Sequence, residues 1–170
     1  QLVCRLAEAQ GSEVIGIDPD TKRTDLSANF YTSVEEANMT NVDSVIITAA
    51  TSSNEPIEVA TKIARNKAKI VVVGDIPLNI SRNDFYYKEL ELVVSKSYGP
   101  GRYDKQYEIL GKDYPIEYVR WTENRNFEAF IKLLSQNQIH LLDLVTEEVS
   151  FENAPVSYTH LTLPTKRNGW

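Results

Sequence analysis

Residues 42–75, VDSVIITAATSSNEPIEVATKIARNKAKIVVVGD, decide the fold class of this chain. The stretch begins with a nearly continuous apolar run, residues 42–50, and ends with a second one, residues 69–75. Both runs have the length of a strand, and such runs are typical of strands that are covered on both faces of a parallel sheet. Each run is therefore predicted to be a buried strand, and the second carries Gly74 near its carboxyl end.

The segment between these two runs has the periodicity of a helix. Over residues 55–67, one helical stripe is formed by the apolar side chains of Ile57, Ala60, Ile63 and Ala64. Ser53 or Asn54 is the candidate N-cap, and Pro56 is tolerated in the first turn. A strand, a helix and a strand in this order predict an α/β fold with a parallel sheet.

The first eighteen residues extend the alternation toward the N-terminus. An amphipathic helix from Gln1 leads into the apolar strand 14–17, which stops at Asp18. In a dinucleotide-binding βαβ unit, an acidic residue at this position accepts hydrogen bonds from the ribose hydroxyls, and a glycine-rich turn precedes the helix. That turn is not in the sequence, so the chain is expected to begin inside a cofactor site, with the first strand and the glycine-rich turn missing.

The remaining segments supply further elements of the same kind. They are expected to be a short polar helix after the turn 19–22, a strand near 29–31, a helix with the capping box Ser33 and Glu36, a helix at 81–88, an edge strand at 89–95, a helix capped by Thr122, a strand at 141–149 and a helix from about 151. The helix after Thr122 has an apolar stripe of Phe127, Phe130, Ile131 and Leu134. The order predicts a partial Rossmann-type, doubly wound parallel sheet.

Residues 98–121 differ in character from the rest of the chain. They hold Tyr98, Tyr103, Tyr107, Tyr114, Tyr118 and Trp121, interspersed with glycines and prolines. This composition predicts a long ordered loop rather than a flexible linker. We favour packing of the tyrosines, with their hydroxyl groups at the rim, over the alternative of a platform for carbohydrate.

Composition narrows the partners of the chain. Its 170 residues are 42% hydrophobic and 25% charged, which is typical of a globular domain. The net charge of −6 argues against nucleic acid, and no apolar run reaches the roughly 20 residues of a membrane span. A cytoplasmic protein without membrane contact is expected. Single Cys4 forms no internal disulfide, and two histidines do not suffice for a zinc cluster.

The C-terminal end of the chain is expected to be foreign to the protein. The residues from about Val156 onward, VSYTHLTLPT and those that follow, resemble translated sequencing-adapter read-through. Residues 156–170 are therefore predicted to be non-native, the alternative being a genuine polar extension.

Within this order of elements, the chain resembles the medium-chain dehydrogenase/reductase family, the relatives of zinc-type alcohol dehydrogenases. The residues that match the family pattern are Asp18 and the segments 43–49, 71–75 and 143–155. Segments 88–92, 97–104 and 114–123 are similar to a bacterial subgroup of two-domain oxidoreductases. The resemblance implies a truncated dinucleotide-binding domain at 1–97, the aromatic loop at 98–121, and the C-terminal return segment of a catalytic domain at 122–155.

The resemblance also implies an activity and a cofactor. The parent protein would be a dehydrogenase that uses NAD, because the Asp18 carboxylate repels the 2′-phosphate of NADP. Cofactor contacts are expected from Asp18, Arg23, Thr48, Ala49, Ala50, Gly74 and Asp75. The substrate would be a small alcohol, an aldehyde or a sugar-derived molecule, in keeping with the subgroup's link to surface polysaccharide synthesis. The parent is expected to be a homo-oligomer, with residues 90–95 as interface candidates; its catalytic residues and zinc content stay unassigned.

Two other functions remain open from the sequence. A Rossmann-type S-adenosylmethionine-dependent methyltransferase also binds a ribose with an acidic residue after its second strand, but usually ends in an antiparallel hairpin. A non-enzymatic nucleotide-sensing module would not need residues 122–155. Because the missing first strand lies at the centre of the usual strand order, residues 1–170 alone are predicted to be unstable, inactive and unable to bind NAD.

Overall fold

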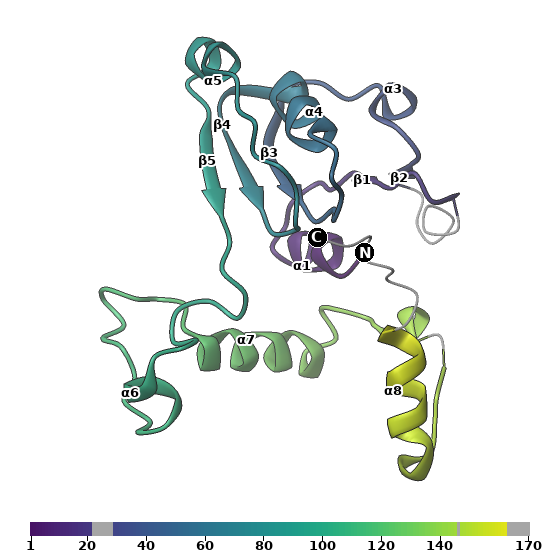
Figure 1. Cartoon of the computed structure of the whole chain (residues 1–170), viewed down its shortest axis with the longest axis vertical. Helices are drawn as coiled ribbons and strands as arrows, with labels where there is room; N and C mark the ends of the chain where they lie inside the picture. The colour runs from purple at the N-terminus through teal and green to yellow at the C-terminus, as the bar shows by residue number, and fades with distance from the viewer. Residues whose placement is uncertain (22–28, 146, 163–170) are drawn as a thin grey trace.

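The computed structural model describes residues 1–21, 29–145 and 147–162. Its elements are α1 (Leu2–Ala9), β1 (Gly16–Ile17), β2 (Phe30–Tyr31), α3 (Val34–Ala37), β3 (Val42–Ile47), α4 (Glu55–Ile63), β4 (Ala64–Val72), α5 (Arg82–Lys88), β5 (Glu91–Val94), α6 (Lys105–Glu108), α7 (Glu123–Ser135), η1 (Leu142–Leu144), η2 (Phe151–Asn153) and α8 (Ala154–Thr162). Strands and helices alternate as predicted, and the α/β class is confirmed (Figure 1). The polar helix expected after the turn 19–22 falls largely outside the described residues.

The described strands form two separate parallel sheets. One contains β1 and β2, and the other has the order β3-β4-β5. In a Rossmann-type sheet of order 3-2-1-4-5-6, these pieces correspond to strands 3-2 and 4-5-6. The position between β1 and β3 is the one that the sequence predicts to be missing, so the division into two sheets agrees with that prediction.

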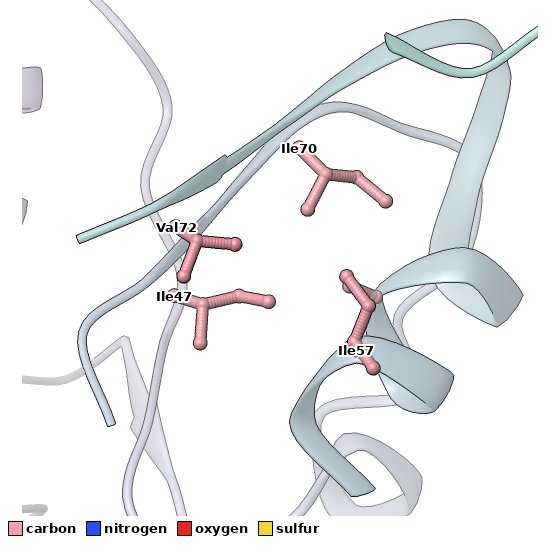
Figure 2. Packing of buried hydrophobic residues seen from close by; sticks show 5 residues of the cluster. Ile47, Ile57, Ile70 and Val72 are labelled. Carbon is pink, nitrogen blue, oxygen red and sulfur yellow. The ribbon is translucent and has the colours of Figure 1, made fainter. Parts of the chain in front are cut away.

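The core of the larger sheet lies between its strands and α4. Ile57 of α4 packs with Ile47, Ile70 and Val72 from the strands (Figure 2), and each of these side chains is at most 5% exposed. Residues 68–72 of β4 alternate between buried and more exposed positions because successive side chains in a strand point to opposite faces.

The prediction that residues 42–50 are covered on both faces is wrong. Ile46 and Val93, which lie in one row across the sheet through Val71, are each 43% exposed. The described helices α4 and α5 contact the opposite face, which carries the buried residues. An apolar run thus indicated the strand correctly but overstated its burial.

The helix predicted at 55–67 ends early, at Ile63, and β4 starts at once with Ala64. The ammonium group of Lys88, at the end of α5, binds the last turn of α4. It donates to the carbonyl oxygens of Thr61, Lys62 and Ala64, at 2.7, 2.9 and 2.8 Å. These contacts use all three donors of the ammonium group and satisfy carbonyls that a helix end leaves unpaired.

The capping box predicted for α3 is confirmed in part. The Ser33 hydroxyl accepts a hydrogen bond from the Glu36 backbone N–H at 3.2 Å, as in a capping box. The Glu36 carboxylate reaches back one residue further than expected, to the backbone N–H of Thr32 at 2.8 Å and to its hydroxyl at 2.6 Å. These hydrogen bonds hold the pKa of Glu36 below its ordinary value.

The strand predicted at 141–149 is wrong. Residues 142–144 form η1, and the other described residues of this range have no strand structure. A strand needs a neighbour for its backbone groups, and no described segment pairs with this one. The helix expected from about 151 is confirmed by η2 and α8. A helix can form in native and foreign sequence alike, so α8 does not test the origin of residues 156–170. That these residues are non-native stays a prediction.

Candidate functional site

The carboxyl ends of β3 and β4 meet at one edge of the larger sheet. The backbone N–H groups of Val73 and Gly74 both donate to the carbonyl oxygen of Ile47, at 2.9 and 3.0 Å. The Thr51 N–H donates to the Asp75 carbonyl oxygen at 3.0 Å. These contacts bring together five of the predicted cofactor residues. We call them the strand-end site: Thr48, Ala49, Ala50, Gly74 and Asp75.

Gly74 is the tightest point of the strand-end site. A Cβ atom at this position would overlap the carbonyl oxygen of Ala49 and lie 2.7 Å from the carbonyl carbon of Thr48. The backbone of Gly74 is not in the left-handed region, so the requirement for glycine is purely steric. The space next to Gly74 is filled by the neighbouring loop. The role expected for Gly74 at a cofactor is therefore indirect, because Gly74 allows the positions that Thr48 and Ala49 take.

The loops on either side of the strand-end site are tied together by side-chain amides. Asn54 donates from Nδ2 to the Asn79 carbonyl oxygen, and its Oδ1 accepts from the Asn79 N–H, both at 3.1 Å. The two candidate caps of α4 share the task, because the Ser53 hydroxyl accepts from the Glu55 N–H at 3.1 Å while Asn54 occupies the cap position. This edge of the sheet is thus held by paired hydrogen bonds.

Asp18 stands at the end of the other sheet. Its N–H donates to the Tyr31 carbonyl oxygen at 3.0 Å, which extends the pairing of β1 with β2. Its Oδ1 accepts from the Asp20 N–H at 3.0 Å, so the carboxylate closes a local turn and is half-buried. Asp18 directly follows β1, so its predicted place at the end of a strand is confirmed. No described contact joins it to the strand-end site, and Arg23 lies outside the described residues.

Part of the aromatic segment 98–121 packs against the first turn of α7. The packing that we favoured from the sequence is found for Tyr107 and Tyr114, whereas Tyr98, Tyr103 and Tyr118 are exposed. The rings of Tyr107 and Tyr114 stack with centroids 5.6 Å apart. The Tyr107 hydroxyl donates to Thr122 Oγ1 at 3.2 Å and accepts from the Asn124 N–H at 2.9 Å. Thr122 holds the predicted cap position with its side chain fully buried, but the capping oxygen comes from Tyr107.

One carboxylate in this segment has a perturbed pKa. Tyr114 donates a hydrogen bond to Asp104 Oδ2, and the Gln106 N–H donates to Oδ1 of the same side chain at 2.8 Å. These bonds lower the pKa of Asp104, with the one from Tyr114 contributing most. The same bond raises the pKa of Tyr114. Asp104 therefore acts as a structural acceptor at the start of α6.

Cations beside the aromatic rings were missed by the sequence reasoning. The guanidinium of Arg102 lies 5.1 Å from the ring centroid of Tyr98 and 4.7 Å from that of Tyr103, and Lys96 lies 5.3 Å from the latter. Arg120 covers Trp121 at 4.3 Å. The pairs Arg102-Tyr103 and Arg120-Trp121 are adjacent in the sequence, and this spacing could have indicated the contacts.

Two kinds of site are not found in the described ranges. No group of three or more His, Cys, Asp or Glu residues there is arranged to hold a metal ion. Likewise, none of the helices that the structure describes has both the length and the apolar character of a membrane span.

Comparisons with known proteins place the chain by its fold. No family model matches it, and the curated proteins give no match either. A crystal structure from Sinorhizobium meliloti 1021, named as a proposed alcohol dehydrogenase, is similar with a TM-score of 0.54 and 13% identity. The match covers 94% of this chain and 42% of that protein, so the chain spans less than half of its length. The similarity, with the parallel sheets described above, shows that this chain has a partial Rossmann-like α/β fold.

Proposed function

We propose that the protein is an oxidoreductase of the medium-chain dehydrogenase type, in which this chain forms most of the cofactor domain. It would transfer a hydride between NAD and an alcohol, an aldehyde or a sugar-derived substrate. The observation that carries the proposal is the set of parallel strands in the order 2-1 and 3-4-5, with the predicted cofactor residues at strand ends. In open α/β sheets, ligands bind outside the carboxyl ends of the strands, where the strand order reverses.

The residues of this chain have defined tasks under the proposal. Asp18 would accept hydrogen bonds from the adenosine ribose, and its charge would disfavour NADP. The strand-end site would hold the backbone of Thr48 and Ala49 against the cofactor, a position that the contact with Gly74 fixes. NAD itself supplies the hydride chemistry, so the protein binds, orients and excludes water. A segment before Gln1 would supply the central strand and its glycine-rich turn.

The methyltransferase alternative is less well supported. All described strand pairs are parallel, whereas those enzymes usually end in an antiparallel hairpin. A solved structure similar to this chain is also named as a dehydrogenase. For the quaternary structure we propose a homo-oligomer that pairs through β5, because β5 is the last strand of its sheet and Val94 is exposed.

A thermal-shift comparison of the full-length protein with NADH, NADPH and S-adenosylmethionine tests the proposal. We expect stabilisation by NADH, and the Asp18→Asn variant should bind NADH about tenfold more weakly because it loses charge-assisted hydrogen bonds. Asp20→Asn is the matched control, since it removes a neighbouring carboxylate from the same turn. Stabilisation by S-adenosylmethionine alone would refute the proposal, as would equal losses in the two variants.

A further inference from the structure

Two exposed tyrosines and two cations form a cluster directly after β5. We call Lys96, Tyr98, Arg102 and Tyr103 the Tyr–Arg cluster. The residues Tyr98 and Tyr103 are 55% and 72% exposed, and the Arg102 guanidinium lies within 5.1 Å of both ring centroids. Exposed aromatic rings with a shared cation offer a surface that binds both an apolar ring face and a negative charge.

The backbone presents these rings at a cost. Tyr98 and Tyr103 have φ angles of 65° and 67°, in the left-handed region that non-glycine residues seldom occupy. Hydrogen bonds hold the turn in place, from Lys96 Nζ to the Arg102 carbonyl oxygen at 3.0 Å and from Asn126 Nδ2 to the Tyr98 carbonyl oxygen at 3.1 Å. Strained residues that the surrounding structure maintains are concentrated at functional sites.

The Tyr–Arg cluster follows the same sheet edge as the strand-end site. β5 runs parallel to β4, and the Ser95 N–H continues their pairing by donating to the Val72 carbonyl oxygen at 2.8 Å. Figure 1 shows the chain leaving β5 beyond the ends to which all three strands point. The cluster thus follows the last strand of the proposed cofactor edge, on the side away from Asp18, where a substrate would meet the reactive end of the cofactor.

The charges of the cluster restrict the charge of a ligand that it can bind. Arg102 forms an ion pair with Glu108 at 2.8 Å, so the charge of Lys96 is left in excess within the cluster. One excess charge suits a ligand with a single anionic group better than a polyphosphate or a nucleic acid backbone. Tyrosine combines an apolar ring with a polar rim, which matches a sugar, because a sugar also has an apolar C–H face and hydroxyl groups at its edge.

We propose that the Tyr–Arg cluster binds the substrate, and that this substrate is a sugar that carries one anionic group. The inference rests on the proposed oxidoreductase function. Arg102 and Lys96 neutralise the anionic group, while Tyr98 and Tyr103 lie against the sugar ring.

Ligand-observed NMR titrations of the full-length protein test this inference, with D-glucuronate, D-glucose 6-phosphate, D-glucose and acetate as probes. We expect at least one anionic sugar to bind about tenfold more tightly than glucose, the gain of one charge-assisted hydrogen bond. Whichever anionic sugar binds more tightly identifies the group as a carboxylate or a phosphate. Binding of acetate as tight as that of the anionic sugars overturns the inference, as does equal binding of glucose.

Two matched variants separate ligand binding from a structural role of the ion pair. Arg102→Gln and Glu108→Gln break the same contact, but only the first removes the cation. We expect Arg102→Gln to lose the tenfold preference for the anionic sugar and Glu108→Gln to keep it. Equal losses in the two variants would mean that the ion pair only holds the loop, and the inference would fall.

A third variant and a second ligand complete the test. Tyr103→Asn removes the exposed ring while keeping a residue that tolerates the left-handed conformation, and it should weaken binding of the anionic sugar several-fold. NADH binding is measured on the same samples. NADH binding without any anionic sugar binding refutes only the substrate inference, whereas a wild-type protein that binds no NADH refutes the proposed function itself.

Discussion

At the scale of single residues, Gly74 shows how one missing methyl group positions a site. The end of β4 approaches the Thr48–Ala49 peptide so closely that only a hydrogen fits between them. This contact lies between loops that the sequence places 25 residues apart, and their side chains are mostly exposed. Sequence reasoning identified both loops by their small residues, but the contact partner of Gly74 depends on the register of two strands.

We expect Gly74→Ala to destabilise the full-length protein by about 1–3 kcal/mol, the usual cost of forcing an extra group into a packed site. The backbone has to move because the overlapping atoms belong to the peptide of Ala49. Urea denaturation measures the change. Asp75→Ala, one residue on and exposed, should change the free energy of unfolding little. An unchanged midpoint for Gly74→Ala would contradict the close approach.

The Asp104–Tyr114 hydrogen bond predicts a pH dependence for the aromatic segment. The lowered pKa of Asp104 means that its contribution is present above the ordinary aspartate pKa and is lost as the pH falls through the lowered value. The raised pKa of Tyr114 means that its contribution is lost only as the pH rises through a value above 10.

Near-ultraviolet circular dichroism of the tyrosines should therefore be constant between about pH 4 and pH 10 and change outside this range. Asp104→Asn should shift the acid limb, and Glu117→Gln, an exposed neighbour, should not. If Asp104→Asn left the profile unchanged, the hydrogen bond would not determine the order of this segment.

At the scale of elements, α7 depends on the aromatic loop for its N-terminal cap. The Tyr107 hydroxyl accepts from the Asn124 N–H, and the Pro100 carbonyl oxygen accepts from the Glu123 N–H at 2.8 Å. Two of the four N–H groups that a helix start leaves unpaired are satisfied in this way. Two apolar residues of the predicted stripe, Phe127 and Ile131, are exposed, so the cap contributes more to holding α7 than that part of its apolar face.

Tyr107→Phe should destabilise this region by about 1 kcal/mol, the typical cost of a lost cap. The ring stays, so its stacking on Tyr114 is preserved while the hydroxyl contacts to α7 are lost. Hydrogen exchange of the Asn124 amide gives the local measurement, and Tyr118→Phe is the control because its side chain is 87% exposed. Equal exchange rates in the two variants would show that Tyr107 does not cap the helix.

Elements with local signals were predictable from the sequence, and those that depend on partners were not. Residues 42–47, 55–63 and 82–88 have the predicted type because apolar periodicity and caps are local. The predicted strand at 141–149 failed because a strand requires a paired neighbour, which no local pattern reports. For the candidate site, Thr48 and Gly74 were found by their positions after apolar runs. The hydrogen bond from the Tyr107 hydroxyl to Thr122 depends on a tertiary contact, and no local pattern indicated it.

At the scale of the whole molecule, the described strands form two incomplete sheets. β1 pairs only with β2 and β3 pairs only with β4 among the described strands, so each has one side without a partner strand. The outer face of the larger sheet also carries exposed apolar residues such as Ile46. Both features are explained if another part of the full-length protein supplies a central strand and a surface that packs on this outer face.

We therefore expect residues 1–170, expressed alone, to melt without a cooperative transition and to bind no NAD. Buried backbone groups without partners cost about 1–3 kcal/mol each, which a marginally stable domain does not tolerate. Differential scanning calorimetry and NADH fluorescence measure the two properties. A version that begins one strand and one glycine-rich turn earlier should recover both. A sharp melt with micromolar NAD affinity for residues 1–170 would disprove this prediction.

The open edges of β1 and β3 also affect how such chains would associate. The edges of β1 and β3 belong to different strands, so pairing of one with the other between two copies is head-to-tail rather than two-fold symmetric. Contacts of this kind close into a ring only if the rotation between copies permits it, and otherwise propagate into open filaments. Copies that lack the central strand and pair β1 with β3 in this way would thus form rings or filaments as their concentration rises, rather than two-fold symmetric dimers.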